Sequence, residues 1–211
     1  MKGKKLWIIV GILGAITLTA LIFELINMQN RFIAPIEDVK KANEEAKNRI
    51  EEIDRENCRA AIAEALQITD PSIKEVESTE EQEKTAEKFD AKLLQIYKVL
   101  DGSEQRYALK VSSSGSQGTI VMMVGFDKDG RISGVSVVSH SETSGIGTKV
   151  VGNESTVSGV GALDQYRGKS AEDYPLEIGK GIDAVSGATV TGKGITKGVN
   201  AAIAVFQLLK Q

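Results

Sequence analysis

The stretch DAVSGATVTGKG, residues 183–194, gathers small and hydroxyl side chains just before an apolar helical pattern. Small residues such as Gly187 and Ala188 let a ligand approach the backbone closely. The first amides of a helix and the positive end of its dipole attract phosphate. The stretch is therefore a candidate anion cradle. A strand-to-helix turn capped by a Thr would explain the same residues, and residue types alone leave both interpretations open.

Other motifs for phosphate or metal chemistry are absent from the sequence. The only GKS, residues 168–170, lacks the Walker glycine, because Leu163 stands at that position. The chain has 1 Cys and 1 His, Cys58 and His140. This composition excludes an internal disulfide, a multi-histidine metal site and an iron–sulfur cluster built from this chain alone. No metal site is expected.

A C-terminal helix must position the candidate cradle. Its apolar residues recur at i, i+4, i+7, i+8 and i+11, which is one face of a helix. The pattern predicts a helix that begins near Thr191 to Lys193 and runs to about Leu209. The residues that form this face are Ile195, Val199, Ala202, Ile203 and Phe206.

Strands precede this helix. The β-rich segments are QIYKVL, RYALKVS, TIVMMVGF and RISGVSVVSH, and DKDG at residues 127–130 is the expected hairpin turn between the last two. Calcium binding by DKDG is excluded because Val138 stands where an EF-hand loop needs Glu. The fold class is therefore α+β, with a twisted, largely antiparallel sheet and packed helices.

The acidic charge of the chain is concentrated before this sheet. Residues 37–90 hold 17 Asp and Glu against 9 Lys and Arg, whereas residues 91–211 hold 11 against 13. Helical spacing from Val39 to Ala61 predicts a stalk helix, ended by TDPS at residues 69–72. The segment ESTEEQEKTAEK is expected to be an exposed connector or a short helix. No basic face suggests nucleic-acid binding.

The N-terminus carries an uncharged apolar run from Leu6 to Phe23. As a helix this run covers about 27 Å, close to the hydrocarbon core of a bilayer. We expect an uncleaved membrane anchor because the run is longer than the apolar core of a signal peptide. Lys2, Lys4 and Lys5 precede it, so the N-terminus is expected in the cytoplasm and the rest outside.

The sequence thus divides into three expected parts. Residues 1–26 form the cytoplasmic tip and transmembrane anchor in the cell membrane. Residues 27–90 form the acidic helical stalk and connector. Residues 91–211 form the distal α+β domain, which carries the candidate cradle.

Asp183, Ser186, Gly187, Ala188 and Thr189 form the pattern D-x-x-S-G-A-T. This pattern resembles the flavinylation motif of the FMN-binding domain family, in which the final Thr carries FMN through a phosphoester bond. The resemblance implies that Thr189 carries covalent FMN.

Two further segments support the resemblance. HSETSGIG, residues 140–147, resembles H-x-E-T-P-G-[LI]-G, and QYRGKS, residues 165–170, resembles Q-[FY]-x-G-K. With one N-terminal span and this length, the chain is similar to the G subunits of Rnf-type ion-translocating electron-transport complexes. Ser144 stands where the family pattern has Pro, which leaves the rigidity of that loop open.

The resemblance implies an electron carrier and its cofactor contacts. The family couples electron flow between ferredoxin and NAD to Na⁺ or H⁺ movement. The expected partners are the other subunits of the complex, a flavin transferase during maturation and the lipid bilayer. No autonomous catalysis and no catalytic residue are expected, since Thr189 is an acceptor. The expected cofactor-binding residues are Thr189, Asp183, Ser186, Gly187, Ala188, Val190, Lys193, His140, Glu142, Thr143, Gly145 and Gly147.

Some alternatives stay open at this point. Glu142 either faces the flavin or is an exposed loop carboxylate. The chain as a whole could instead be the related FMN subunit of a Na⁺-pumping NADH:quinone oxidoreductase or a free-standing extracellular flavoprotein. It could also be a nonredox anchored binding module, in which the turn is only a helix cap.

Overall fold

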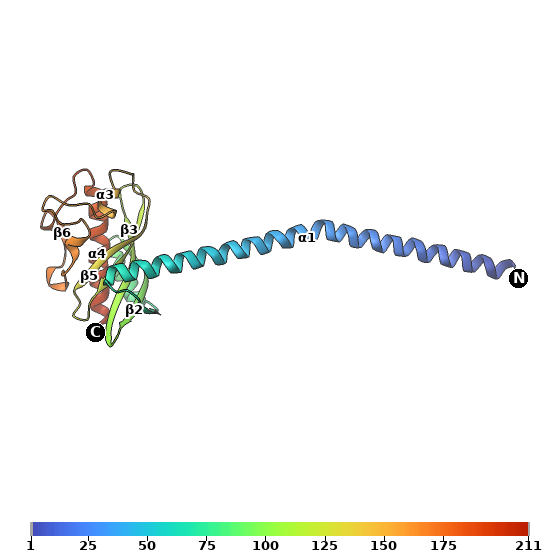
Figure 1. Cartoon of the computed structure of the whole chain (residues 1–211), viewed down its shortest axis with the longest axis horizontal. Helices are drawn as coiled ribbons and strands as arrows, with labels where there is room; N and C mark the ends of the chain where they lie inside the picture. Colours follow the sequence, from blue (N-terminus) through green and yellow to red (C-terminus); the bar gives the residue numbers. More distant parts are fainter. Residues whose placement is uncertain (1, 211) are drawn as a thin grey trace. The chain divides into compact units, whose positions relative to one another are not determined.

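The computed structural model describes the backbone of residues 2–210 and the side chains of residues 21–29, 31 and 36–210. The chain divides into two compact units, Met1–Asp54 and Arg55–Gln211. Helix α1 (Lys2–Leu66) forms the first unit and provides the first element of the second (Figure 1). The helix predicted for the stalk is confirmed, because α1 continues to Leu66.

The expected anchor, residues 6–23, lies mostly outside the part of the chain whose side chains are described. Within the described part, no helix is both long enough and apolar enough to cross a membrane.

The second unit is built on a five-stranded sheet of order β1-β2-β3-β4-β5, in which every neighbouring pair is antiparallel. The prediction of an α+β fold with an antiparallel sheet is confirmed, and all four predicted segments lie in strands apart from Arg131, which precedes β5. The edge strand β1 was not predicted, because it is short and most of its residues are charged or polar. The strands are β1 (Ser72–Val76), β2 (Ala91–Asp101), β3 (Glu104–Ser114), β4 (Thr119–Phe126) and β5 (Ile132–His140).

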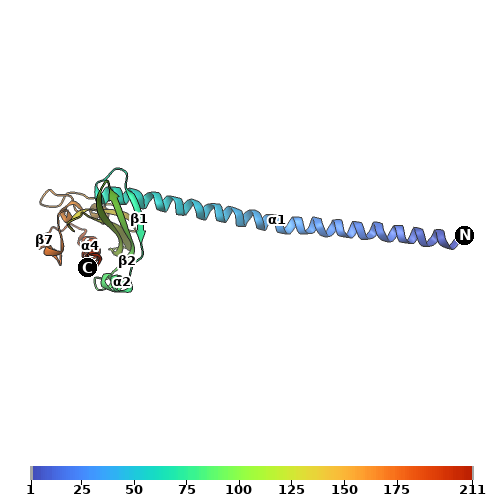
Figure 2. The same ribbon diagram turned by 90° about the horizontal axis from the view of Figure 1, so that it is seen from below.

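The helix α4 (Thr189–Leu209) covers one face of the sheet. Alternate residues of β4 point to this face and are fully buried with the apolar stripe of α4, as the twofold period of a strand requires. Gly194 permits the close approach, since a Cβ there would lie 2.4 Å from the Ser114 carbonyl oxygen of β3. Helix α2 (Glu80–Glu87), the short helix allowed for in the connector, packs beside α4 and β2 (Figure 2).

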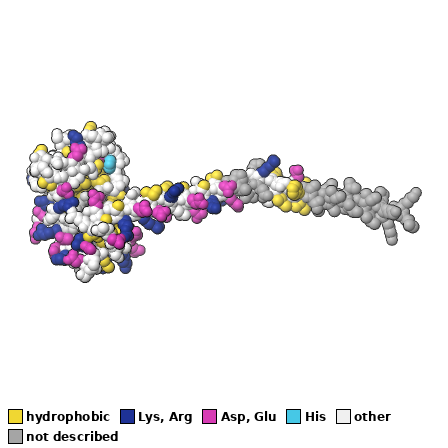
Figure 3. Space-filling view, in the orientation of Figure 1, with side chains coloured by type: hydrophobic (Ala, Val, Ile, Leu, Met, Phe, Trp, Pro, Cys, Tyr) yellow, Lys and Arg dark blue, Asp and Glu magenta, His cyan; other side chains and the backbone are white. Residues whose placement is uncertain are grey.

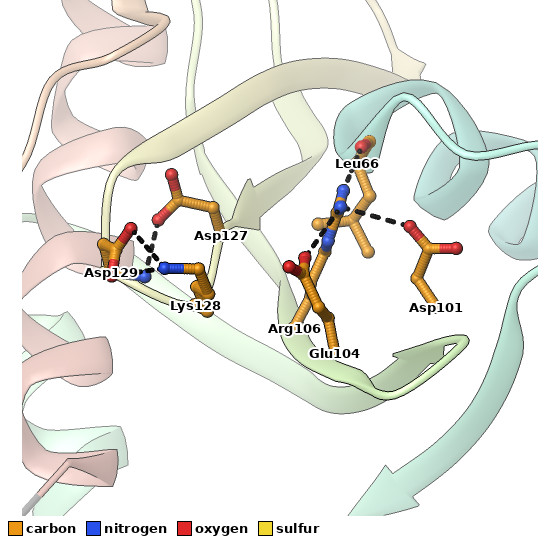
Figure 4. Close-up of polar contacts among 7 residues, drawn as sticks. All are labelled: Leu66, Asp101, Glu104, Arg106, Asp127, Lys128 and Asp129. Atoms are coloured by element: carbon orange, nitrogen blue, oxygen red, sulfur yellow. Dashed lines mark hydrogen bonds and ion pairs between the residues drawn. The ribbon is translucent and has the colours of Figure 1, made fainter.

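The last turns of α1 cover the other face of the sheet. Ile62 and Leu66 are 1% exposed there and pack with Tyr97 of β2 and Met123 of β4. Arg106 of β3 completes this contact (Figure 4). Its guanidinium donates to the Leu66 carbonyl at 3.2 Å and pairs with Asp101 and Glu104 at 3.1 and 3.2 Å. The sheet therefore lies between two helical segments.

The predicted hairpin turn between β4 and β5 is confirmed. The Asp127 carboxylate accepts hydrogen bonds from the amides of Asp129 and Arg131, each at 2.9 Å. Figure 4 shows this carboxylate turned back over its own turn, beside the exposed Lys128–Asp129 pair. Asp127 thus closes the turn, as Asp side chains commonly do.

Short elements connect β5 to α4. The first of them, α3, lies at the end of the domain where α4 begins (Figure 1), whereas Ser170 and Ala171 lie near the other end of α4, beside Phe206. These elements are α3 (Thr148–Val151), the 3-10 turns η1 (Asp164–Tyr166) and η2 (Ala171–Asp173), and the two-residue strands β6 (Glu177–Ile178) and β7 (Gly181–Ile182).

Candidate functional site

The first turn of α4 begins inside the D-x-x-S-G-A-T pattern. Helix α4 starts at Thr189, and its first helical hydrogen bond runs from the Gly192 amide to the Ala188 carbonyl at 3.0 Å. The predicted start near Thr191 to Lys193 is therefore wrong by at least two residues. The apolar period begins only at Ile195, so it did not reveal a first turn made of Thr, Val and Gly.

The N-terminus of α4 has no side-chain cap. Ala188 is the N-cap residue, and no described side chain accepts a hydrogen bond from the first-turn amides. The interpretation of the turn as a helix capped by a Thr is therefore wrong. The amides of residues 189–191 precede the first helical bond and have no acceptor within the helix. An anionic group would find unpaired donors at this position.

A tight turn leads into the helix. The Ala188 amide donates to the Val185 carbonyl at 3.0 Å, and Gly187 has φ of 77° at the third position of this turn. Only glycine adopts that conformation without strain. No described atom lies within 4 Å of the place where a Cβ of Gly187 would stand. The space above the turn is open to a ligand.

The hydroxyl groups of the motif differ in their exposure. Ser186 and Thr189 are exposed, and so are Val190 and Lys193. Thr191 is 0% exposed, although it lies only two residues from Thr189. Lys193 forms no ion pair with any described residue. The structure thus presents Thr189 to solvent beside an unpaired cation.

Gln165 fixes the first residue of the motif. Its side-chain oxygen accepts from the Asp183 amide at 2.7 Å, and its side-chain nitrogen donates to the Asp183 carbonyl at 3.3 Å. The Asp183 carboxylate accepts from the Thr156 hydroxyl at 3.4 Å. Gln165 therefore holds the backbone of Asp183, and Thr156 holds its half-buried carboxylate.

Tyr166 connects the same segment to α4. The hydroxyls of Tyr166 and Thr196 lie 2.7 Å apart, and both side chains are buried. Burial raises the pKa of Tyr166 to about 12. In the segment QYRGKS, Gln165 therefore positions the D-x-x-S-G-A-T pattern, and Tyr166 positions helix α4. Gln165 was quoted in the sequence pattern but was not predicted as a site residue.

The loop HSETSGIG lies against the first turn of α4 through Glu142. Glu142 is 8% exposed, so the interpretation of this residue as an exposed loop carboxylate is wrong. Its carboxylate accepts from the amides of Ser116 and Gln117 at 2.8 and 3.1 Å and from the Thr191 hydroxyl. The expected flavin contact of Glu142 stays a prediction, and the contacts seen are with protein groups.

The other residues of this loop differ in exposure. His140, Thr143 and Gly145 are exposed, whereas Gly147 is buried against Glu142. The His140 ring nitrogen Nδ1 accepts from the Glu142 amide at 3.2 Å. Ser144, at the position of the family Pro, is exposed and precedes Gly145 with φ of 76°. Thr143 and Gly145 are therefore accessible to solvent.

The surface at this end of the domain is weakly charged. Figure 3 shows few Lys, Arg, Asp or Glu side chains on the visible surface around α3, whereas charged groups gather over the rest of the domain. Ile146, Val157 and Val190 are 51, 86 and 58% exposed. A cleft of about 540 Å³ lies at the other end of α4, lined by Arg131, Phe206 and Lys210 among others.

Comparison with known proteins agrees with these motifs. Residues 115–204 match the FMN-binding domain family. This range contains the loop at 115–117, HSETSGIG, QYRGKS, the D-x-x-S-G-A-T pattern and α4 as far as Ala204. The resemblance to this family is therefore confirmed.

Several relatives share this part of the chain. The G subunit of the Na⁺-translocating ferredoxin:NAD⁺ oxidoreductase complex of Acetobacterium woodii is 35% identical over 129 residues, which cover 56% of this chain and 58% of the relative. The G subunit of the proton-translocating ferredoxin:NAD⁺ oxidoreductase complex of Clostridium ljungdahlii is 36% identical over 101 residues, which cover 46% of this chain and 51% of the relative. The G subunit of the ion-translocating oxidoreductase complex of Stutzerimonas stutzeri is 35% identical over 98 residues, which cover 44% of this chain and 41% of the relative. The chain spans about half the length of these curated relatives.

Proposed function

We propose, from the premise that residues 115–204 form an FMN-binding domain, that this chain is an electron-transfer subunit with FMN bound covalently to Thr189. The observation that carries the proposal is the position of Thr189. It is exposed, it is the first residue of α4, and it ends the D-x-x-S-G-A-T pattern. A phosphoester at this hydroxyl would place a phosphate beside unpaired helix amides.

The residues around Thr189 fit a phosphodiester. The first-turn amides and the Ser186 hydroxyl are donors to phosphate oxygens, and hydrogen bonds to ionised acceptors are the strong ones. The open space above Gly187 admits the group close to the backbone. Lys193, one turn along the helix, offsets the remaining negative charge. Ser186, Gly187, Ala188, Val190 and Lys193 are thus the proposed phosphate contacts.

The exposed loop and its apolar neighbours fit the flavin ring. Thr143 and Gly145 offer a hydroxyl and a backbone approach, and Ile146 and Val190 offer apolar surface at the same end of the domain. FMN supplies one-electron and two-electron redox chemistry when it is bound. The chain holds and orients the group and sets its electrostatic surroundings. A covalent bond keeps the flavin local even where a dissociated cofactor would be diluted away.

The proposed setting is a membrane complex of the Rnf type. Relatives at about 35% identity are subunits of ion-translocating ferredoxin:NAD⁺ oxidoreductases. We place the span at residues 6–23 with the N-terminus in the cytoplasm and the FMN domain outside, because Lys2, Lys4 and Lys5 precede the run. Other subunits of that complex, a flavin transferase and the bilayer are the proposed partners. The named relatives translocate either Na⁺ or protons, so the coupling ion is left open.

One experiment tests the attachment directly. The full chain is expressed in its own host or with a flavin transferase, and the denatured protein is viewed under ultraviolet light and digested for mass spectrometry. Fluorescence that survives denaturation, an FMN adduct on the peptide containing Thr189, and loss of both in Thr189→Val are the expected results. Ser103→Ala, which removes an exposed hydroxyl in the turn between β2 and β3, is the control and should keep the adduct.

The same experiment tests the alternative that the chain is a nonredox binding module. A nonredox binding module would give an unmodified, nonfluorescent Thr189 peptide in cells that contain the transferase, and this result would overturn the electron-carrier proposal. Purification of the native complex and identification of its other subunits then separates the Rnf type from the related quinone-linked pump and from a free-standing flavoprotein.

A further inference from the structure

Glu142 is a buried carboxylate whose two oxygens are both used by the protein. Oε1 accepts from the amides of Ser116 and Gln117 at 2.8 and 3.1 Å. Oε2 accepts from the hydroxyl of Thr191 in the first turn of α4. One side chain thus joins the loop after β3, the loop after β5 and the start of α4. A buried carboxylate is stabilised by such hydrogen bonds and is costly to leave without them.

Two glycines leave little room around this carboxylate. A Cβ at Gly115 would lie 2.2 Å from Glu142 Oε1, and a Cβ at Gly147 would lie 2.3 Å from Oε2. The His140 ring accepts from the Glu142 amide at 3.2 Å and fixes the backbone at the same residue. The carboxylate is therefore confined next to Thr191.

The contact with Thr191 determines how the first turn of α4 is rotated. Successive helix residues are about 100° apart, so residues two apart point to nearly opposite sides. Thr191 is 0% exposed and faces Glu142, and Thr189 is exposed on the side away from it. Holding one hydroxyl inward therefore holds the other outward.

We propose that Glu142 is a positioning residue for flavin attachment: through the Thr191 hydroxyl it fixes the rotation of the first turn and presents Thr189, not Thr191, to the flavin donor. The proposal rests on the proposed function. In this proposal Glu142 acts through its hydrogen bond to Thr191, whereas the sequence predicted a direct contact with the flavin. It also explains why one of two neighbouring threonines is available for modification.

The attachment step balances with an activated donor. In flavin adenine dinucleotide the FMN phosphate is joined to AMP by a phosphoanhydride bond. The Thr189 oxygen forms a new P–O bond to the FMN phosphorus, the anhydride bond breaks, AMP leaves, and the hydroxyl proton passes to a base of the transferase. No electrons are transferred. Glu142 is remote from this chemistry and acts only by holding the acceptor in place.

The test compares four variants of the full chain, each with its transferase and saturating flavin adenine dinucleotide. Glu142→Ala removes all three acceptor contacts, and Thr191→Val removes only the hydroxyl at nearly constant volume. Glu142→Gln keeps an oxygen for the two amides and turns an NH₂ toward Thr191, whose oxygen can accept. Glu154→Ala, an exposed carboxylate in the next loop, is the matched control. The initial rate of adduct formation and the modified residue are measured for each.

We expect Glu142→Ala and Thr191→Val to slow modification of Thr189 by about ten-fold or more, the order of effect expected when a reacting group is misplaced. In Glu142→Ala we also expect part of the adduct to move to Thr191. Glu142→Gln should keep most of the rate, and Glu154→Ala should match the wild type. A purely structural role of Glu142 would lower the yield of folded protein without moving the adduct or being restored by Gln.

The outcomes separate the two proposals. If the wild type carries no adduct on Thr189, the proposed function fails. If the wild type is modified and both Glu142→Ala and Thr191→Val are modified at Thr189 at the wild-type rate, the positioning role is overturned. If Glu142→Ala does not fold, Thr191→Val decides, since it leaves the two amide contacts in place. A fifth protein that combines Glu142→Ala with Thr191→Val should be modified no more slowly than the slower of these two single variants, because both substitutions act through one contact.

Discussion

The side chain of Gln165 holds the backbone of Asp183 from both sides, accepting from its amide at 2.7 Å and donating to its carbonyl at 3.3 Å. The two residues are 18 positions apart in the sequence. This pair joins the segment QYRGKS to the segment D-x-x-S-G-A-T. It gives the two patterns a physical connection that their spacing alone does not reveal.

Gln165→Ala should loosen the attachment motif. The substitution leaves the half-buried Asp183 amide without its acceptor, and the loss of such a hydrogen bond costs about 0.5–1.5 kcal/mol. We expect the free energy of unfolding to fall by about this amount in urea titrations. We also expect slower flavin attachment. Gln207→Ala, at an exposed position of α4, is the control and should change neither. Unchanged stability and attachment in Gln165→Ala would contradict the role of this pair.

Two glycines of α4 should respond in opposite ways to the same substitution. Gly→Ala inside a helix gains about 1 kcal/mol of helix propensity at either position. At Gly194 the new Cβ would lie 2.4 Å from the Ser114 carbonyl oxygen, so Gly194→Ala should destabilise the domain by about 1–3 kcal/mol. At Gly192 the only described neighbour is the end of the Ile178 side chain at 3.0 Å, which can move.

Thermal unfolding of both variants checks this contrast. Gly192→Ala should unfold near the wild-type temperature or above it, and Gly194→Ala well below it. Equal effects at the two positions would show that α4 does not approach β3 as closely as the structure places it.

Tyr166 should make the domain sensitive to high pH. Burial raises the pKa of Tyr166 to about 12, above the value of 10.0 for a free tyrosine. The unfolded chain therefore loses this proton first. The stabilisation is fully present below pH 10 and is lost as the pH rises through about 12.

The melting temperature measured from pH 8 to pH 12 tests this dependence. Tyr166→Phe should lower stability by about 1 kcal/mol at neutral pH, since the hydrogen bond to Thr196 is lost. The melting temperature of Tyr166→Phe should also fall less steeply above pH 10 than that of the wild type. Tyr97 and Tyr174, whose pKa values are also raised by burial, account for the slope that remains. An identical slope in Tyr166→Phe would contradict the assignment.

Arg106 should hold the end of α1 on the sheet. Its guanidinium donates to the Leu66 carbonyl at 3.2 Å while pairing with Asp101 and Glu104 (Figure 4). Arg106→Ala should lower stability by about 1.5–3 kcal/mol, the usual cost of a hydrogen bond to a charged group. Hydrogen exchange at residues 62–68 should become faster.

Arg106→Lys is the matched variant for this prediction. It keeps the charge but lacks the forked donors that reach the carbonyl and both carboxylates together. Its exchange rate should lie between those of the wild type and Arg106→Ala. Wild-type exchange at residues 62–68 in both variants would show that the apolar contacts of Ile62 and Leu66 suffice.

Much of the fold could be predicted from the sequence because it depends on local periodicity. The β-rich run TIVMMVGF predicted β4 to the residue, and the apolar face from Ile195 to Phe206 predicted the body of α4 and its end near Leu209. The edge strand β1 and the first turn of α4 were missed. Neither carries an apolar period. Pairing with β2 stabilises β1, and the contact of Thr191 with Glu142 stabilises the first turn of α4.

The sequence by itself determined the motif, the family resemblance and the one hydroxyl proposed to carry FMN, because short patterns of Gly, Ser and Thr are read without knowing the fold. Only the tertiary structure decided that Glu142 is turned inward, that Thr191 is buried while Thr189 is exposed, and that Gln165 holds Asp183. The physical reason is that burial and hydrogen-bond partners depend on which loops meet in space. Residues 116, 142 and 191 meet in one contact and residues 165 and 183 in another, and both contacts form only once the sheet and α4 have packed.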